Sequence, residues 1–386
     1  MTVLDHDLAA DWTPDAHGPR RDPAPLLPDS EPVRILGTPA LRRTADSPGG
    51  RELLRDLHRR LVVGRRFNQQ ATTLTKQGRL AVYPASTGQE ACQIAVANAL
   101  RPGDWLFPSY RDTLAVVSRG VDPLETLTLL RGNAHCGYDP YRHQVAPLST
   151  PLATQAPHAV GLAHAARLRG DSTVALALVG DGGTSEGDFH EALNFAGVLN
   201  APVVFLVQNN GYAISVPLAK QSAAPTLAHK AVGYGIQGRL VDGNDAVAVH
   251  AVLSEAVQHA RSGQGPVLVE AVTYRLEAHT NADDAGRYRS AEEVAGWQAR
   301  DPLTLMERHL REAGVIGDAE VAAAAAEAEQ LADRMRTLFH VKPELDPMSL
   351  FEHVYAEPTP QLREQAAQLA AELAAEAATG ATGEQR

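Results

Sequence analysis

A glycine-rich segment of the chain has the residue types that can hold a phosphate. It reads GDGGTSEG over residues 180–187 and lies between a short apolar run and a helical pattern. Glycines let the backbone approach a ligand closely, and the free N–H groups at a helix start attract a phosphate. The segment is neither a Walker loop, because Gly-Lys-Ser/Thr is absent, nor a dinucleotide fingerprint, because Ser185 stands where a third glycine is needed. By itself such a segment is more often a plain turn.

A second polar segment, Asn209-Asn210-Gly211-Tyr212, follows the next apolar run, with 26 residues between Gly182 and Asn209. Parallel strands open their carboxyl ends on one edge of a sheet, so Asp181 and Asn210 are expected to converge beside the ligand-binding crevice. Carboxylate and amide oxygens next to a phosphate suit Mg²⁺. Asn-Asn-Gly alone is better explained as a turn with left-handed residues, so the prediction depends on the two segments together.

Hydrophobic periodicity predicts the elements that position these residues. Residues 173–179 and 202–207 are continuous apolar runs, typical of strands buried on both faces of a parallel sheet, with a helical pattern at 189–199 between them. A third run at 266–270 follows a helical stretch at 246–260. We therefore expect an α/β fold with a doubly wound, mostly parallel sheet. Further helices are expected at residues 51–67 and 90–100, beyond Glu320, and at 361–378.

The ends of the chain differ from this central part. Residues 1–45 begin with many prolines and acids and are expected to form an extended N-terminal arm. Residues 46–345 are expected to form the α/β domain, and residues 346–386 a C-terminal tail that ends in a helix. The first residues have neither the apolar block of a secretory signal nor the basic character of a transit peptide, so no targeting segment is expected.

Composition excludes several classes of protein. Lysine and arginine number 35 against 46 acids, for a net charge of -11, which is the wrong sign for broad nucleic-acid or anionic-membrane binding. No apolar stretch approaches the roughly 20 residues needed to cross a bilayer as a helix. Cys92 and Cys136 form no CxxC motif, so neither a disulfide framework nor a structural zinc site is indicated. A reducing, cytoplasmic setting is expected.

The sequence around these segments resembles the alpha subunit of the decarboxylating component of 2-oxo acid dehydrogenases. Gly180-Asp181-Gly182, followed after 26 residues by Asn209-Asn210, looks like the thiamine diphosphate motif of that family. The resemblance runs from about Glu31 to the last helix and implies a thiamine diphosphate-binding fold. Further matching segments occur in the family's order: residues 61–67, 88–91, 110–112, 151–155, 274–275, 279–280, 349–351 and 354–355.

The resemblance implies how the cofactor is held. Asp181, the side chain of Asn210 and the carbonyl of Tyr212 would ligate Mg²⁺, and Leu152 and Ile214 would press the cofactor into its bent shape. Tyr110 and Arg111 would reach the diphosphate, as a fixed guanidinium fork suits that ligand. The other implied cofactor contacts are Thr150, Gly180, Gly182, Gly183, Thr184 and His279. Ser149, Pro151, Thr154 and Gln155 match a monovalent-ion site of the branched-chain relatives, so K⁺ is a further candidate ligand.

His279 is the implied catalytic residue. It would sit at the mouth of the cofactor pocket and act as a general acid, a role suited to a near-neutral pKa. Arg275, Asp283, Tyr288 and Arg289 would organise the loop around it. The family often has a second histidine before this position, but Glu277-Ala278 stand here. Gln208 also stands where relatives can carry an arginine. Thr280 occupies the place of a phosphorylated serine in mammalian relatives, although a plain loop hydroxyl is the simpler interpretation, and the segment 131–144 has no assigned place.

The implied reaction is oxidative decarboxylation of a 2-oxo acid, with reductive acylation of a lipoyl group on the acyltransferase component. A beta subunit would complete the active site in an assembly of two alpha and two beta chains. Residues 149–155, 210–215 and 349–365 look more like branched-chain enzymes, which act on 3-methyl-2-oxobutanoate, than like pyruvate or acetoin enzymes. Two alternatives from other classes stay open: a non-catalytic assembly subunit of the same fold, and an NAD-binding oxidoreductase, which the missing fingerprint disfavours.

Overall fold

The computed structural model describes residues 22–133, 135–339 and 346–383. A five-stranded parallel sheet lies at its centre, in the order β1-β2-β3-β7-β6. The expected mostly parallel, doubly wound α/β fold is confirmed. The strands are β1 (Trp105–Phe107), β2 (Ala175–Gly180), β3 (Val203–Asn209), β6 (Gln237–Asp242) and β7 (Val267–Val272).

Helices cover both faces of this sheet, which explains the continuous apolar runs of its central strands. In β2, Ala175, Ala177 and Val179 pack into one core, whereas Leu176 and Leu178 pack into the other, as the two-residue period of a strand requires. The first core is closed by α7 (Gln155–Arg169), α8 (Gly187–Leu199) and the 3₁₀ helix η6 (Leu227–Tyr234). The second is closed by α3 (Glu90–Ala99), α4 (Thr113–Ser118) and α9 (Ala246–Arg261).

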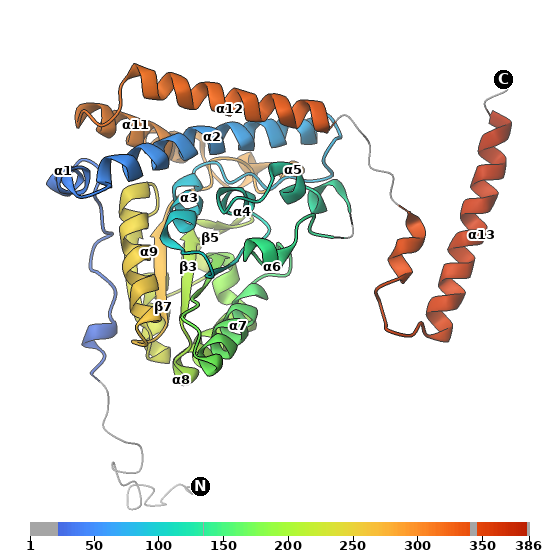
Figure 1. The fold of residues 1–386 in the computed structure, drawn as a ribbon, viewed down its shortest axis with the longest axis horizontal. Helices are drawn as coiled ribbons and strands as arrows, with labels where there is room; N and C mark the ends of the chain where they lie inside the picture. The colour runs from blue at the N-terminus through green and yellow to red at the C-terminus, as the bar shows by residue number, and fades with distance from the viewer. Residues whose placement is uncertain (1–21, 134, 340–345, 384–386) are drawn as a thin grey trace, which may run out of the picture.

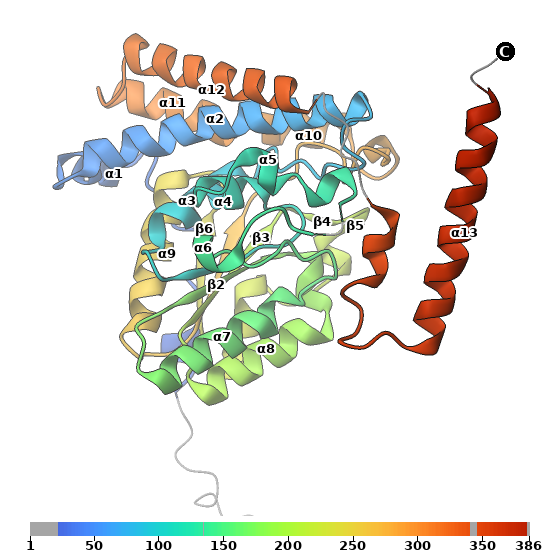
Figure 2. The ribbon, with the colours of Figure 1, turned by 45° about the vertical axis from the view of Figure 1, so that its right-hand side comes forward.

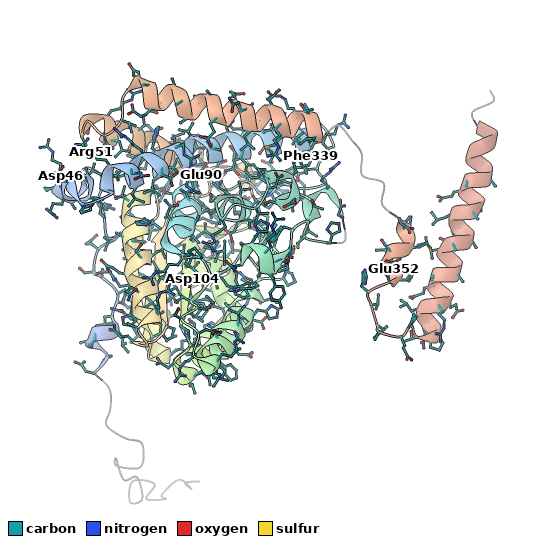
Figure 3. All side chains as sticks on the ribbon, in the orientation of Figure 1. Asp46, Arg51, Glu90, Asp104, Phe339 and Glu352 are labelled. Carbon is teal, nitrogen blue, oxygen red and sulfur yellow. The ribbon has the colours of Figure 1, made fainter. Side chains whose placement is uncertain are left out.

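A further helical layer lies over α3 and α4. Here α2 (Gly50–Lys76) runs across the body, and α12 (Asp318–Leu338) lies along it at the top of Figure 1. Leu54, Leu57 and Leu61 of α2 form a third core with α1 (Pro39–Asp46) and α11 (Pro302–Glu312). Beneath α2, Glu90 is almost fully buried and its Oε1 accepts from Arg65 Nε at 2.5 Å (Figure 3).

The chain ends frame this body. Val33 forms a parallel bridge with Val241 at the β6 edge of the sheet. At the other end, the 3₁₀ helix η8 (Pro347–Phe351) and α13 (Pro360–Gly383) pack on each other and lie apart from the body in Figures 1 and 2. The boundaries at residues 45/46 and 345/346 stay predictions, and residues 1–21 of the expected arm lie outside the described residues. No helix in the described part of the chain is long and apolar enough to span a membrane.

The remaining elements are short. They are α5 (Pro123–Thr126), α6 (Pro140–His143), α10 (Ala291–Gln298), the hairpin of β4 (Tyr212–Ala213) and β5 (Val216–Pro217), and the 3₁₀ helices η2 (Ala24–Leu26), η3 (Leu129–Arg131), η4 (Gly182–Ser185), η5 (Leu218–Lys220) and η7 (Ala285–Arg287). Most of those that bear on function lie at the carboxyl edge of the sheet.

Candidate active site

The glycine-rich segment forms the tight turn that leaves the carboxyl end of β2. Asp181 directly precedes η4, and α8 starts at Gly187. A Cβ on Gly182 would lie 2.7 Å from the Cβ of Ala213, and one on Gly183 would lie 2.9 Å from Val179 Cγ1. Both distances are closer than carbon atoms approach without displacement, so glycine is required where the turn passes the β4 hairpin and the end of β2.

The second polar segment leaves the neighbouring strand β3, whose Gln208 is in register with Gly180. The backbone N–H of Asn210 points to Asp181 Oδ1, at an N to O distance of 3.4 Å. The predicted convergence of Asp181 and Asn210 is therefore seen in the structure.

Asp181 is an almost fully buried carboxylate, and burial raises its pKa above the ordinary value. Its Oδ2 accepts from the amide of Gln221 at 2.8 Å, and no cationic side chain of the described residues forms an ion pair with it. A buried carboxylate with only neutral donors is costly unless a cation compensates it. The chemistry of this position therefore fits a divalent cation.

The other two predicted metal ligands lie beside Asp181 and already have protein partners. Asn210 donates through Nδ2 to Gln89 Oε1 at 3.1 Å and accepts at Oδ1 from the N–H of Tyr212 at 3.2 Å. The carbonyl of Tyr212 accepts from Arg275 Nη1 at 3.2 Å. The second lone pair of each oxygen remains for a further contact.

A cavity of about 220 Å³ opens in front of this turn. It brings together all the predicted cofactor contacts except Thr150, which is exposed outside the lining, and Thr184, whose hydroxyl donates to the carbonyl of Asp181 at 2.8 Å. The lining also contains Gln89, Ser109, Asp112, Ala153, Gln155, Val179, Glu186, Gln208, Ala213 and Arg275.

Two apolar side chains project at the cavity although they are poorly covered by protein. Leu152 is 42% exposed and Ile214 is 55% exposed. Ile214 has φ of +55°, a left-handed conformation that is strained for a β-branched residue. Its carbonyl accepts from Arg275 Nη2 at 2.7 Å, which helps to hold this conformation. These exposed apolar side chains could therefore pack against a bound ligand and act as a wedge.

Arg111 and His279 contact each other in the lining of the cavity. Arg111 Nη2 lies 3.0 Å from His279 Nδ1 and 2.9 Å from its carbonyl oxygen, while Nη1 donates to the carbonyl of Ala85. The ring of Tyr110 lies 5.5 Å from the Arg111 guanidinium carbon. Because Nδ1 faces guanidinium N–H groups, we assign the imidazole proton to Nε2.

Burial, followed by the charges of Arg111 and Arg275, lowers the pKa of His279 to about 4. The expectation of a near-neutral pKa is therefore wrong for this arrangement, because the sequence did not reveal that two arginines face one ring. At neutral pH His279 is therefore uncharged, with an Nε2–H group that can donate a hydrogen bond.

The loop that carries His279 is held as the sequence resemblance implied. Asp283 Oδ2 accepts from the N–H of His279 at 2.8 Å and from the hydroxyl of Tyr288. Arg289 donates to the backbone carbonyls of Arg275, Leu276 and Glu277. The segment 131–144 contributes nothing to the cavity lining, and residue 134 lies outside the described part of the chain.

Sequence reasoning singled out Gln208 but not the network of buried amides to which it belongs. Gln89, Gln93 and Gln208 form a network that ends on Asp112 Oδ1, which Gln208 Nε2 reaches at 2.7 Å. Glutamine has no sequence signature of its own, so only its position near the resemblance motifs could have indicated a role. Gln221 had no such signal.

Comparisons with known proteins agree with this arrangement. The family model described as "Dehydrogenase E1 component" matches residues 58–342. The 3-methyl-2-oxobutanoate dehydrogenase subunit alpha of Mycobacterium tuberculosis (strain ATCC 25618 / H37Rv) is 45% identical over 91% of this chain and 97% of its own. The pyruvate dehydrogenase E1 component subunit alpha of Acholeplasma laidlawii is 38% identical, over 82% and 92% respectively. That of Staphylococcus aureus (strain COL) is 42% identical, over 68% and 72%.

Proposed function

Since the chain belongs to the dehydrogenase E1 component family, we propose that it is the alpha subunit of a branched-chain 2-oxo acid dehydrogenase that uses thiamine diphosphate and Mg²⁺. The single observation that carries the cofactor proposal is the buried carboxylate of Asp181, which forms no ion pair within the described part of the chain and lies beside Asn210 at the tip of β2. The 45% identity to a 3-methyl-2-oxobutanoate dehydrogenase subunit, over nearly the full length of both chains, favours the branched-chain substrate.

We assign the metal to Asp181, Asn210 Oδ1 and the carbonyl of Tyr212, which are oxygen donors of the kind that Mg²⁺ prefers. The backbone of Gly182 and Gly183, at the start of η4, has N–H groups that a helix start leaves unpaired, and these would receive a diphosphate. Arg111 lines the same cavity and would add a guanidinium. Thr150 lies outside the cavity lining, so the structure gives no support to its predicted contact with the cofactor.

The bound cofactor would supply the electron sink for loss of CO₂, and this chain would supply position and polarity. Leu152 and Ile214 would exclude water and support the cofactor's bend. His279, neutral with its proton on Nε2, would donate a hydrogen bond to a substrate oxygen at the mouth of the cavity. Arg111 and Arg275 would keep it in that state.

The active site requires a second chain in this proposal. The carboxylates that line the cavity are Asp112, Asp181 and Glu186, and Asp112 is taken by Ser109, Gln93 and Gln208. As the family resemblance implies, the carboxylate that activates the cofactor's pyrimidine would come from a beta subunit, in a heterotetramer of two alpha and two beta chains. A lipoyl-bearing acyltransferase would take the acyl group. K⁺ at Ser149, Pro151, Thr154 and Gln155, and a cytoplasmic location, stay predictions.

Turnover of the co-purified alpha–beta complex tests the substrate. Reductive acylation of a lipoyl domain is measured with 3-methyl-2-oxobutanoate, pyruvate and acetoin, and we expect 3-methyl-2-oxobutanoate to give the highest kcat/KM. Pyruvate dehydrogenase is the alternative that the A. laidlawii and S. aureus relatives favour, and faster pyruvate turnover would establish it. Absence of turnover with every substrate, together with absence of cofactor binding, would indicate a non-catalytic assembly subunit.

A further inference from the structure

One carboxylate outside the cavity joins two tyrosines that belong to different parts of the site. The hydroxyl of Tyr212 lies 3.0 Å and 2.9 Å from the two carboxylate oxygens of Glu293, and the hydroxyl of Tyr274 lies 3.0 Å from Oε1. An ionised carboxylate has only acceptor oxygens, so both hydroxyls act as donors to Glu293.

Glu293 lies in the first turn of α10 and is fixed there by the helix start. Ser290 precedes the helix, and its side chain accepts from the backbone N–H of Glu293 at 3.1 Å. None of the residues of this helix is fully buried, so side chains that are only partly buried hold it to the body. Its other contact with the site is Trp297, which stacks on Tyr274 with ring centroids 5.2 Å apart and planes 6° apart. The helix is thus attached to the site largely through Glu293 and Trp297.

Both tyrosines are connected to groups that line the cavity. Tyr212 carries one of the carbonyls assigned to the metal. Tyr274 precedes Arg275, whose guanidinium donates to the carbonyls of Tyr212 and Ile214 and lies 3.5 Å from His279 Nδ1. The turn of residues 210–214 is consequently held by two side chains: Arg275 donates to its backbone carbonyls, and Glu293 accepts from its tyrosine hydroxyl.

We propose that Glu293 is a positioning residue that fixes the 210–214 turn and Arg275 relative to each other, so that the Tyr212 carbonyl is held ready for a metal. The proposal rests on the function proposed above. The effect is geometric, because Glu293 does not line the cavity and contacts the hydroxyl of Tyr212 rather than its carbonyl. Glutamine can preserve it, since its oxygen accepts from one hydroxyl and its amide donates to the other, whereas alanine cannot.

Two measurements on the alpha–beta complex test this. Calorimetric titration of Mg²⁺ in the presence of thiamine diphosphate is expected to give an affinity about 10-fold weaker for Glu293→Ala, since two hydroxyls lose a charged acceptor. Glu293→Gln should stay near the unsubstituted affinity. Glu292→Ala is the matched control, because Glu292 is an exposed glutamate on the same helix. Hydrogen exchange without ligand should be faster in residues 210–214 of Glu293→Ala than in the same residues of Glu292→Ala.

The outcomes separate this inference from the function on which it rests. Equal Mg²⁺ affinity and equal exchange in Glu293→Ala and the unsubstituted complex would overturn the role of Glu293. Failure of the unsubstituted complex to bind the cofactor would overturn the proposed function, and the exchange measurement would still decide whether Glu293 fixes the turn. If Glu293→Ala does not assemble, Tyr274→Phe carries the same comparison, because it removes only one hydroxyl; unchanged affinity and exchange there would count against the proposal.

Discussion

Arg111 donates through one nitrogen, Nη2, toward both the ring and the carbonyl oxygen of His279, at 3.0 Å and 2.9 Å. This contact occupies the Nδ1 edge of the imidazole and leaves the Nε2 edge for a ligand. With Nδ1 turned to a cation and the ring partly buried, His279 is neutral, and its Nε2–H is the group left for a ligand. The same arginine is assigned to the diphosphate, so anion binding and the state of His279 are linked through one side chain.

Removing that guanidinium should raise the pKa of His279. In Arg111→Met the pKa is expected to move from about 4 toward the ordinary histidine value but not to reach it, because burial is the largest cause of the shift and Arg275 remains. Titration by NMR with labelled histidine measures this, and His279→Gln identifies the resonance. A pKa that stays at about 4 in Arg111→Met would show that Arg111 has no electrostatic effect on the ring.

The close approach of Gly182 to the β4 hairpin predicts a damaging but repairable substitution. Gly182→Ala places a Cβ 2.7 Å from that of Ala213, and such overpacking typically costs about 1–3 kcal/mol. We expect weaker cofactor binding in calorimetry. Gly187→Ala is the control, because nothing lies within 4 Å of its Cβ position. The pair Gly182→Ala with Ala213→Gly should recover affinity; if it does not, the clash is not the cause.

Substitution of Ile214 should affect the stability of the complex and its turnover in opposite ways. Asparagine tolerates the left-handed conformation better than isoleucine, and relief of such strain is worth about 1–3 kcal/mol. Ile214→Asn is therefore expected to hold or raise the thermal midpoint of the complex while lowering kcat, because the apolar wedge is lost. Val216→Asn, at a similarly exposed position outside the cavity lining, should leave kcat unchanged. Full kcat in Ile214→Asn would contradict the wedge.

Mg²⁺ binding should weaken on acidification, because the metal needs the ionised Asp181. Burial raises the pKa of that carboxyl, so affinity is expected to fall as pH falls through a pKa above the ordinary aspartate value, about tenfold per pH unit below it. Gln221 hydrogen-bonds the carboxylate and lowers this pKa. Gln221→Met should therefore move the fall in affinity to higher pH, as calorimetry across a pH series can measure. Identical pH profiles would mean that Gln221 does not act on Asp181.

The central part of the fold follows from sequence alone because its strands are buried on both faces. The runs expected at 173–179, 202–207 and 266–270 correspond to β2, β3 and β7, with ends displaced by one or two residues. Two strands gave no such signal: β1 has only three residues, and β6 reads Gln-Gly-Arg-Leu-Val-Asp, with polar side chains suited to an edge. The helix α7 was hidden by small residues and by Pro157 in its first turn.

The candidate site also has features that the sequence could predict and others that it could not. Asp181 and Asn210 could be paired in advance, because parallel strands bring their carboxyl ends to one edge. The state of His279 could not, since it depends on Arg111 and Arg275, which lie 168 and 4 residues away from it along the chain. Glu293 and Gln221 were equally hidden, because a side-chain contact between distant loops leaves no local pattern.

The proposed function depends on Asp181 and Asn210 jointly holding a divalent cation that anchors a diphosphate. Calorimetric titration of thiamine diphosphate into the alpha–beta complex, with Mg²⁺ and with a chelator, tests it most directly, alongside Asp181→Asn and the control Asp188→Asn at an exposed position on α8. We expect thiamine diphosphate to bind only with Mg²⁺, and this binding to be retained by Asp188→Asn and lost by Asp181→Asn. Equal binding with the chelator, or by Asp181→Asn, would contradict it.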